Sequence, residues 1–244
     1  MTAADSHPTR PAWLDTLGRT PPAALPDYFR AYPTPPSPRR RSAVLILFGP
    51  IGGLPDAANA GLDGVDVVLT ERSARLRSHA GQVSFPGGGI DDGDDGPVGA
   101  ALRESEEEIG LVRSSVDIVT RLPSLYLSPS GNAVAPVVGW WRTPGPIGVV
   151  DPREVATVAR VPVADLLDAD NRFTVVSPAG YSAPGFEAGG VFVWGFTAML
   201  LNAVFDAAGL TRPWDDTRRR GIPRGMGPSA RDVARYLAHR AAGR

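Results

Sequence analysis

The fold is decided by the stretch Arg103-Glu104-Ser105-Glu106-Glu107-Glu108-Ile109-Gly110-Leu111. Pro97 suits the first turn of a helix and Gly110 suits the position just past its end, so the sequence predicts a helix from about Pro97 to Ile109. At about 100° per residue, one face of this helix is apolar and three glutamates share a separate arc. The apolar face carries Val98, Ala101, Leu102, Ser105 and Ile109, and the acidic arc carries Glu104, Glu107 and Glu108.

The acidic arc calls for a positive partner. Carboxylates spaced i, i+3 and i+4 on a helix repel one another, at a few tenths of a kcal/mol for each pair. Arg103 can pair with Glu107 one turn away but cannot neutralise three charges, whereas a multivalent cation can. A solvated acidic face is the plainer alternative. The glycine-rich loop before the helix favours the cation, because its backbone carbonyls and the carboxylates can supply the oxygen ligands that Mg²⁺ prefers.

Short Val- and Leu-rich runs around this helix predict strands, and five further segments have helical patterns. Strands interleaved with helices indicate a layered α/β or α+β domain. The expected strands are 42–49, 66–72, 116–122, 132–141, 173–176 and 191–196; the expected helices are 12–17, 24–32, 161–168, 196–208 and one that opens at Ser229; residues 85–96 are expected to form a loop.

Composition removes several classes of chemistry. The 244 residues carry a formal net charge of −1, which argues against a broad nucleic-acid-binding surface. There is no Cys, so a thiolate nucleophile and a Cys-based zinc site are excluded, and with three scattered His a three-His metal site is not expected. All 25 basic residues are Arg, which excludes Schiff-base chemistry. Any metal must be held by oxygen, which points to Mg²⁺, Mn²⁺ or Ca²⁺.

Three regions follow along the chain. Residues 1–40 form a Pro-rich arm, residues 41–210 the compact domain, and residues 211–244 an Arg-rich extension with a terminal helix. The uncharged run from Ala188 to Phe205 divides into a strand and a core helix, so no membrane span is expected. We expect a cytoplasmic protein, since the first residues lack the apolar run of a signal peptide.

The helix and its preceding loop resemble the Nudix box, G-x5-E-x7-R-E-U-x-E-E-x-G-U, where U is a bulky apolar residue. Its tail, R-E-x-x-E-E-x-G-L, is complete here from Arg103 to Leu111. Ser105 stands where U is usual, and the upstream acid is an Asp. That Asp fits in two ways, as Gly89-x5-Asp95-x7-Arg103 or as Gly88-x5-Asp94-x8-Arg103.

A second stretch resembles the coenzyme A pyrophosphatases, a Nudix subfamily in which one extra loop residue is also usual. Their signature is L-T-x-R-S-x3-R-x3-G-x3-F-P-G-G, and shorter similarities follow at 128–131, 136–139 and 194–198. The resemblance covers about residues 40–210. Its positions in this chain are Leu69, Thr70, Arg72, Ser73, Arg77, Gly81, Phe85, Pro86, Gly87 and Gly88.

The resemblance implies a Nudix-type α/β/α sandwich, with a mixed β-sheet flanked by helices. It implies metal-dependent hydrolysis of the pyrophosphate bond of coenzyme A or acyl-CoA, to adenosine 3′,5′-bisphosphate and (acyl-)4′-phosphopantetheine. Mg²⁺ or Mn²⁺ is the expected cofactor, and the assembly is left open, with a homodimer as one candidate. The implied metal ligands are Glu104, Glu107, Glu108 and the carbonyl of Gly88; the implied catalytic set adds Arg103; and the implied substrate-binding residues are Arg72, Arg77, Gly87 and Gly88.

Several alternatives stay open. A Nudix hydrolase could act on ADP-ribose, NADH or a dinucleoside polyphosphate instead, or the fold could serve as a binding module without turnover. The Asp run at 91–95 has some likeness to a calcium loop, although a solvated acidic loop is the simpler interpretation. The general base is either a glutamate of the acidic helix or Glu154. His79 is expected to be a surface residue.

Overall fold

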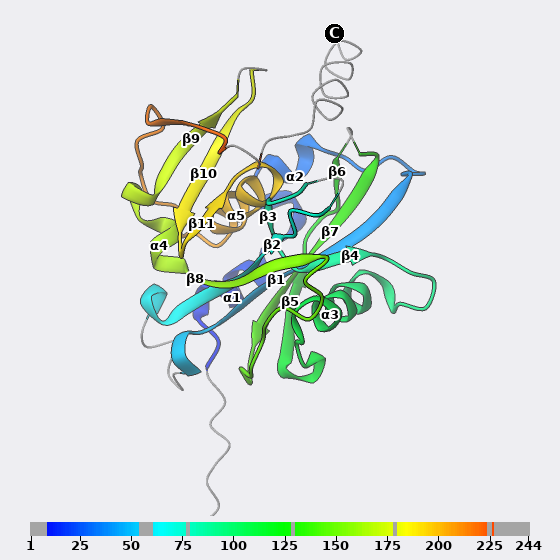
Figure 1. The fold of residues 1–244 in the computed structure, drawn as a ribbon. Coiled ribbons are helices and arrows are strands. Elements are labelled where there is room, and N and C mark those ends of the chain that lie inside the picture. Colours follow the sequence, from blue (N-terminus) through cyan, green and yellow to red (C-terminus); the bar gives the residue numbers. More distant parts are fainter. Residues whose placement is uncertain are drawn as a thin grey trace, which may run out of the picture.

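The computed structural model describes residues 9–53, 61–76, 79–127, 130–177, 180–223 and 226 (Figure 1). Its helices are short, apart from the acidic helix and one near the end of the chain. The α-helices are α1 (Ala12–Arg19), α2 (Tyr28–Ala31), α3 (Gly96–Ile109), α4 (Val163–Leu167) and α5 (Gly195–Ala207). The 3-10 helices are η1 (Pro22–Ala24), η2 (Ile51–Gly53), η3 (Gly61–Gly64), η4 (Arg113–Ser115) and η5 (Ala169–Asn171).

The larger sheet is mixed and is built around one long strand. Its strands are β1 (Arg40–Pro50), β2 (Val65–Arg72), β3 (Val83–Ser84), β4 (Gly87–Gly89), β5 (Val116–Arg121), β6 (Leu125–Leu127), β7 (Asn132–Trp141) and β8 (Val155–Pro162). The main order is β3-β2-β1-β7-β5, while β4 pairs with β1, β6 with β7 and β8 with β2. β1 runs parallel to β7 and antiparallel to β2 and β4.

β1 is buried on both faces, and its alternating side chains enter two separate cores. Ala43, Leu45 and Leu47 pack in the core that contains Ala101 and Ile109 of α3. The other face, with Ile46 and Phe48, packs in a larger core together with α1, α4 and α5. Helices therefore cover both faces of the sheet, and the predicted α/β/α sandwich with a mixed sheet is confirmed (Figure 1).

A second, four-stranded sheet accompanies α5. Its strands are β9 (Arg172–Val176), β10 (Ser182–Ala188), β11 (Val191–Val193) and β12 (Arg219–Gly221), in the order β11-β10-β9-β12. β12 joins β9 in parallel, and the other two pairs are antiparallel. In Figure 1 this sheet stands beside α4 and α5, away from α3.

The observed elements differ from the expected ones in several places, and the short strands β3, β6 and β12 are among those not expected. β8 and β10 were not expected, because Val155–Pro162 has only part of an apolar alternation and Ser182–Ala188 is broken by Pro184 and Gly185. The loop predicted over 85–96 contains the short strand β4, and the helix predicted over 161–168 begins only at Val163. The strand predicted over 191–196 ends at Val193, and the helix predicted over 24–32 is reduced to α2.

The segments outside 41–210 contribute to the same layers. Leu14, Leu17, Leu25 and Phe29 of the Pro-rich arm are buried in the larger core. In the Arg-rich extension, β12 adds a strand to the second sheet. The division at residues 40 and 210 stays a prediction, and the terminal helix expected from Ser229 lies outside the described residues.

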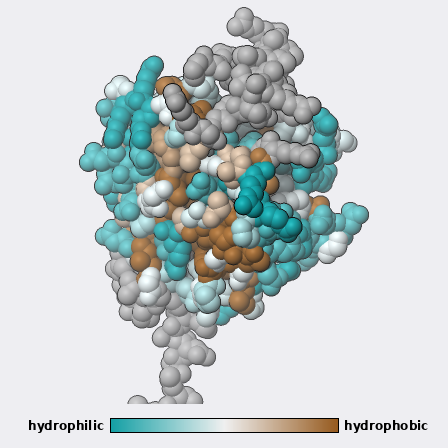
Figure 2. Space-filling model, in the orientation of Figure 1, coloured by the Kyte–Doolittle hydropathy of each residue, from teal (hydrophilic) through white to brown (hydrophobic). Residues whose placement is uncertain are grey.

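Among the described residues, no helix combines the length and apolar character needed to cross a bilayer. The run from Ala188 to Phe205 is divided between β10, β11 and α5. Figure 2 shows apolar surface in the middle of the face seen in Figure 1, with hydrophilic side chains around it.

Candidate active site

The acidic helix α3 forms as the sequence predicts. Pro97 lies in its first turn, and Gly110 ends it with φ +74°, a left-handed conformation that suits glycine. Ser105, at the position where a bulky apolar residue is usual, is fully buried and donates a hydrogen bond from Oγ to Ala101 O at 2.7 Å. Because this bond within the helix satisfies the hydroxyl group, Ser105 can lie on the buried apolar face.

Arg103 is the centre of a network that joins the helix to the preceding loop. Its Nη1 donates to Glu104 Oε1 at 2.9 Å and to Glu107 Oε2 at 3.3 Å. Its Nη2 donates to the carbonyl oxygen of Gly89 at 2.9 Å. The guanidinium therefore fixes two of the three acidic side chains and the end of β4 together.

Asp94, not Asp95, is the loop acid that contacts the helix. Arg103 donates to both of its carboxylate oxygens, Nε to Oδ1 at 2.9 Å and Nη2 to Oδ2 at 3.0 Å. These bonds, with the backbone N–H of Asp91, lower the pKa of Asp94 to about 2. The carboxyl of Asp95 makes no capping bond at the start of α3. The contacts of Asp94 therefore favour the alignment Gly88-x5-Asp94-x8-Arg103, which has one extra loop residue.

Glu108 differs from its neighbours because it is buried. Only 7% of the residue is exposed, and Oε2 accepts a hydrogen bond from the backbone N–H of Gly87 at 3.0 Å. Burial raises the pKa of Glu108 to about 7, against the opposing effects of the Gly87 N–H and of Arg72. Glu104 is also partly buried, and burial raises its pKa too.

The glycines of β4 let the strand approach α3 and β1 closely. A Cβ on Gly88 would lie 2.3 Å from Glu104 Oε2, and one on Gly87 would lie 2.3 Å from the carbonyl oxygen of Ala43. Gly87 also has φ +150°, which side-chain-bearing residues rarely adopt. A Cβ on Gly89 would meet nothing within 4 Å. The space between Gly88 and Glu104 is thus available only because residue 88 has no side chain.

The glutamates share one side of α3, but their carboxylates do not converge. Within the described residues, no three His, Cys, Asp or Glu side chains form a group placed to hold a metal ion. Arg103 binds both Glu104 and Glu107, whereas the Gly87 N–H binds Glu108, so the three carboxylates do not share one partner. The donor set itself fits a hard cation: the ligands are oxygens, the Glu108 carboxylate is buried, and Gly88 leaves room beside Glu104.

Arg72 and Glu154 lie next to this cluster from the sheet side. Arg72 ends β2 opposite Val155, and the backbone N–H of Ser73 donates to the carbonyl oxygen of Glu154 at 2.8 Å. The charges of both side chains act on the Glu108 carboxyl. Among the described residues, the buried Nε of Arg72 has no hydrogen-bond partner. Arg77 lies outside the described residues.

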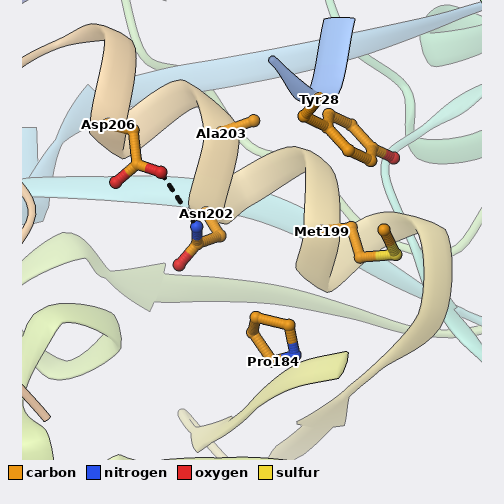
Figure 3. A pocket seen from close by; sticks show the side chains of 6 residues that line it. All are labelled: Tyr28, Pro184, Met199, Asn202, Ala203 and Asp206. Carbon is orange, nitrogen blue, oxygen red and sulfur yellow. Dashed lines mark hydrogen bonds between the residues drawn. The ribbon is translucent and has the colours of Figure 1, made fainter. Parts of the chain in front are cut away.

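A hollow of about 120 Å³ lies elsewhere, between α2, α5 and β10 (Figure 3). Two of its polar side chains are already engaged: Asn202 Nδ2 donates to Asp206 Oδ2 at 3.1 Å, and Asn202 Oδ1 accepts from the buried Arg172. Because α5 packs in the core opposite α3, the hollow is not part of the acidic cluster.

Sequence reasoning identified the glutamates and Arg103 but not their backbone partners. The Gly87 N–H and the Gly89 carbonyl were not expected as hydrogen-bond partners of Glu108 and Arg103, since a glycine pattern does not reveal where a backbone group points. For Asp94, the sequence did contain a signal: the alignment Gly88-x5-Asp94-x8-Arg103 has one residue more than the usual Nudix box spacing.

Comparison with known proteins is consistent with these observations. The NUDIX domain family matches residues 54–177, just over half of the chain. The uncharacterised Nudix hydrolase NudL of Shigella flexneri is 37% identical over 150 residues, which cover 59% of this chain and 76% of that protein. NudL of Escherichia fergusonii is 45% identical over 101 residues, covering 41% of this chain and 52% of its own, so there the match spans about half the relative's length.

Among solved structures, the NUDIX domain of Shewanella oneidensis NrtR, complexed with ADP ribose, has 18% sequence identity and a TM-score of 0.40, covering 58% of this chain and 84% of that one. The family assignment does not depend on this distant likeness. It depends on the matched domain, on the relative that is covered over three quarters of its length, and on the complete glutamate motif of α3. On these grounds the chain belongs to the Nudix hydrolase family.

Proposed function

We propose that the chain is a divalent-metal-dependent pyrophosphohydrolase and that its substrate is coenzyme A or acyl-CoA. The observation that carries the reaction class is the network around Arg103, which holds Glu104 and Glu107 beside the buried Glu108. The substrate class is supported by the resemblance of residues 69–88 to the coenzyme A pyrophosphatases. The placement of the substrate's diphosphate beside this cluster is supported by Arg72, whose charge acts at Glu108 and whose Nε has no hydrogen-bond partner among the described residues.

The proposed ligands of Mg²⁺ or Mn²⁺ are Glu104, Glu107, Glu108 and the Gly88 carbonyl. When bound, the cation supplies Lewis acidity, which polarises the phosphoryl oxygens and stabilises charge on the leaving phosphate. Arg103 orients two of the glutamates through its hydrogen bonds. Arg72 donates to a phosphate oxygen of the substrate, and Arg77 is proposed for the same role because its position matches the motif.

Water attacks one phosphorus of the diphosphate, the bridging P–O bond breaks, and the water's proton passes to a carboxylate. The proton acceptor is either a glutamate of α3 or Glu154. The Ser73 N–H donates to the Glu154 carbonyl, and Ser73 directly follows Arg72. The backbone of Glu154 therefore lies on the sheet side of the acidic cluster. The products from coenzyme A are adenosine 3′,5′-bisphosphate and 4′-phosphopantetheine. No nucleic-acid or membrane partner is needed, and we propose a cytoplasmic enzyme that acts on a small molecule, with a homodimer as the candidate assembly.

A mass-spectrometric product assay tests the proposal. Purified protein is offered coenzyme A, ADP-ribose, NADH and dinucleoside polyphosphates side by side, with Mg²⁺ or Mn²⁺ and with a chelator. We expect metal-dependent 4′-phosphopantetheine from coenzyme A, lost in Glu108→Gln. A loss in Glu154→Gln as well, with substrate binding intact, identifies Glu154 as the proton acceptor.

Other outcomes separate the alternatives. Cleavage of ADP-ribose, NADH or a dinucleoside polyphosphate, but not of coenzyme A, overturns the substrate class and keeps the reaction. Binding of these molecules without turnover of any of them overturns the reaction and favours a binding module.

A further inference from the structure

His79 has the only positive φ among the non-glycine residues of the described chain, at 58°. A left-handed backbone is unfavourable for a side-chain-bearing residue and persists only where its surroundings hold it. Here the holding contacts come from Gln82: the ring Nδ1 lies 2.9 Å from Gln82 Oε1, and the Gln82 N–H donates to the His79 carbonyl at 3.2 Å. The turn 79–82 is therefore closed by a side chain as well as by the backbone.

The amide of Gln82 has its orientation fixed from both ends. Its Nε2 donates to the carbonyl oxygen of Met226 at 3.2 Å, so Oε1 is the end that faces His79 and Nδ1 is the donor there. One side chain thus connects the turn with a residue 144 positions later in the chain.

The C-terminal segment that reaches Met226 is itself attached to the second sheet. Arg220 lies in β12, which pairs with β9, and the Thr174 N–H donates to the Arg218 carbonyl at 2.8 Å. Trp214 lies over the guanidinium of the buried Arg172, 4.8 Å from ring centroid to Cζ. Gln82 therefore connects the turn to an anchored segment.

Gln82 is also bonded to Arg72 through the backbone. Arg72 N–H donates to the Gln82 carbonyl at 2.9 Å, and Gly81 N–H donates to the Arg72 carbonyl at 3.0 Å, extending the β2–β3 hairpin. Arg72 lies beside the acidic cluster, and within the part of the chain that the structure describes its buried Nε has no hydrogen-bond partner. Whatever holds Gln82 in place also holds the backbone of Arg72.

We propose that His79 and Gln82 are positioning residues: together they attach the end of the β2–β3 hairpin to the C-terminal segment and so hold Arg72 where its guanidinium meets the substrate's diphosphate. This inference rests on the proposed function. It makes β12 and Met226, described residues of the Arg-rich extension, part of the substrate side of the enzyme, and it gives His79 a role that does not require it to touch substrate.

The test compares Gln82→Ala, His79→Gly and His79→Asn with the wild type. His79→Gly keeps the backbone conformation and loses the ring, whereas Asn tolerates positive φ and offers an N–H to Gln82. Asn171→Ala is the matched control, because it removes another side-chain amide that donates to a backbone carbonyl, at Asp165 O and 3.0 Å. Two readouts are taken, KM and kcat for coenzyme A, and calorimetric binding of α,β-methylene-ADP, a non-hydrolysable diphosphate.

We expect Gln82→Ala and His79→Gly to raise KM and weaken probe binding by about five- to tenfold, with kcat changed less than about twofold. His79→Asn is expected to restore both values, and Asn171→Ala to leave them unchanged. If Gln82→Ala does not fold, the two variants of the exposed His79 still give the comparison.

Unchanged KM and probe binding in His79→Gly and Gln82→Ala, with only the melting temperature lowered, would overturn the inference in favour of a purely structural turn. If the wild type binds the probe but hydrolyses nothing, the proposed function fails, and probe binding in the variants still decides the positioning role. A wild type that neither binds nor hydrolyses overturns both.

Discussion

Asp94 and Arg103 are joined by two parallel hydrogen bonds, Nε to Oδ1 at 2.9 Å and Nη2 to Oδ2 at 3.0 Å. The carboxylate side chain is only 6% exposed, and the guanidinium of Arg103 is shared with Glu104 and Glu107. A loop residue thus fixes the orientation of the arginine that in turn orients two glutamates of α3.

Asp94→Asn is expected to lower the melting temperature at neutral pH, since Asn keeps the shape but loses the charge. Because the folded-state pKa is depressed to about 2, the stabilisation is present above the ordinary value of 3.8 and is lost as the pH falls toward 2. Thermal unfolding between pH 7 and pH 2 measures this difference. Asp95→Asn is the control, because the Asp95 carboxyl makes no cap bond; equal losses in both variants would contradict the assignment.

Glu108→Gln is expected to change the pH dependence of stability in the presence of a chelator. The folded-state pKa of about 7 exceeds the ordinary 4.5, so the wild type loses stability relative to the variant as the pH rises from 4.5 to 7. The change is at most roughly 3 kcal/mol and is constant above that range. Urea unfolding at several pH values measures this change. A difference in unfolding free energy between wild type and Glu108→Gln that does not depend on pH would show that Glu108 is not buried as described.

Gly88→Ala tests the space beside Glu104. The added methyl meets a carboxylate at the end of a flexible side chain, so the protein folds but Glu104 must move. We expect the Mg²⁺ or Mn²⁺ concentration for half-maximal activity to rise about 10-fold or more. Gly89→Ala, where a methyl meets nothing within 4 Å, is the matched control. The same rise in Gly89→Ala would mean that the effect is general to β4.

Arg103→Lys is expected to lower kcat/KM about 10- to 100-fold, because an ammonium cannot hold Asp94 by two bonds while also reaching two glutamates. A metal titration of activity separates a weaker metal site from a slower reaction. Arg113→Lys, at the exposed ion pair with Glu106, should behave as the wild type. An active Arg103→Lys would remove Arg103 from the proposed machinery.

The sequence allowed α3, its ends and its two faces to be predicted, because proline, glycine and the spacing of apolar residues act locally. It also supported the layered fold, since β1 and β7 are long apolar runs. β10 could not be predicted, because Pro184 and Gly185 interrupt the alternation of apolar residues. Its pairing with β9 and β11 is decided by tertiary contacts.

Within the candidate site, residue types could be predicted but not partners. Three glutamates on one arc were foreseen, whereas the distribution of their carboxylates among Arg103 and the Gly87 N–H depends on how β4 lies against α3. The position of Glu154 beside Ser73 depends on β8, a strand that was not expected. Contacts between distant segments are what a single sequence reveals least.

The alternation along β1 also limits how this chain can evolve. Ala43, Leu45 and Leu47 face α3 while Ile46 and Phe48 face α1 and α5, so both sides of the strand are apolar yet differ in size. Deleting or inserting one residue there would exchange the two sets and drive the Phe48 ring beneath the acidic helix. Substitutions that keep size are tolerable in β1, but changes of length are not, and insertions between homologues are expected to fall outside this strand.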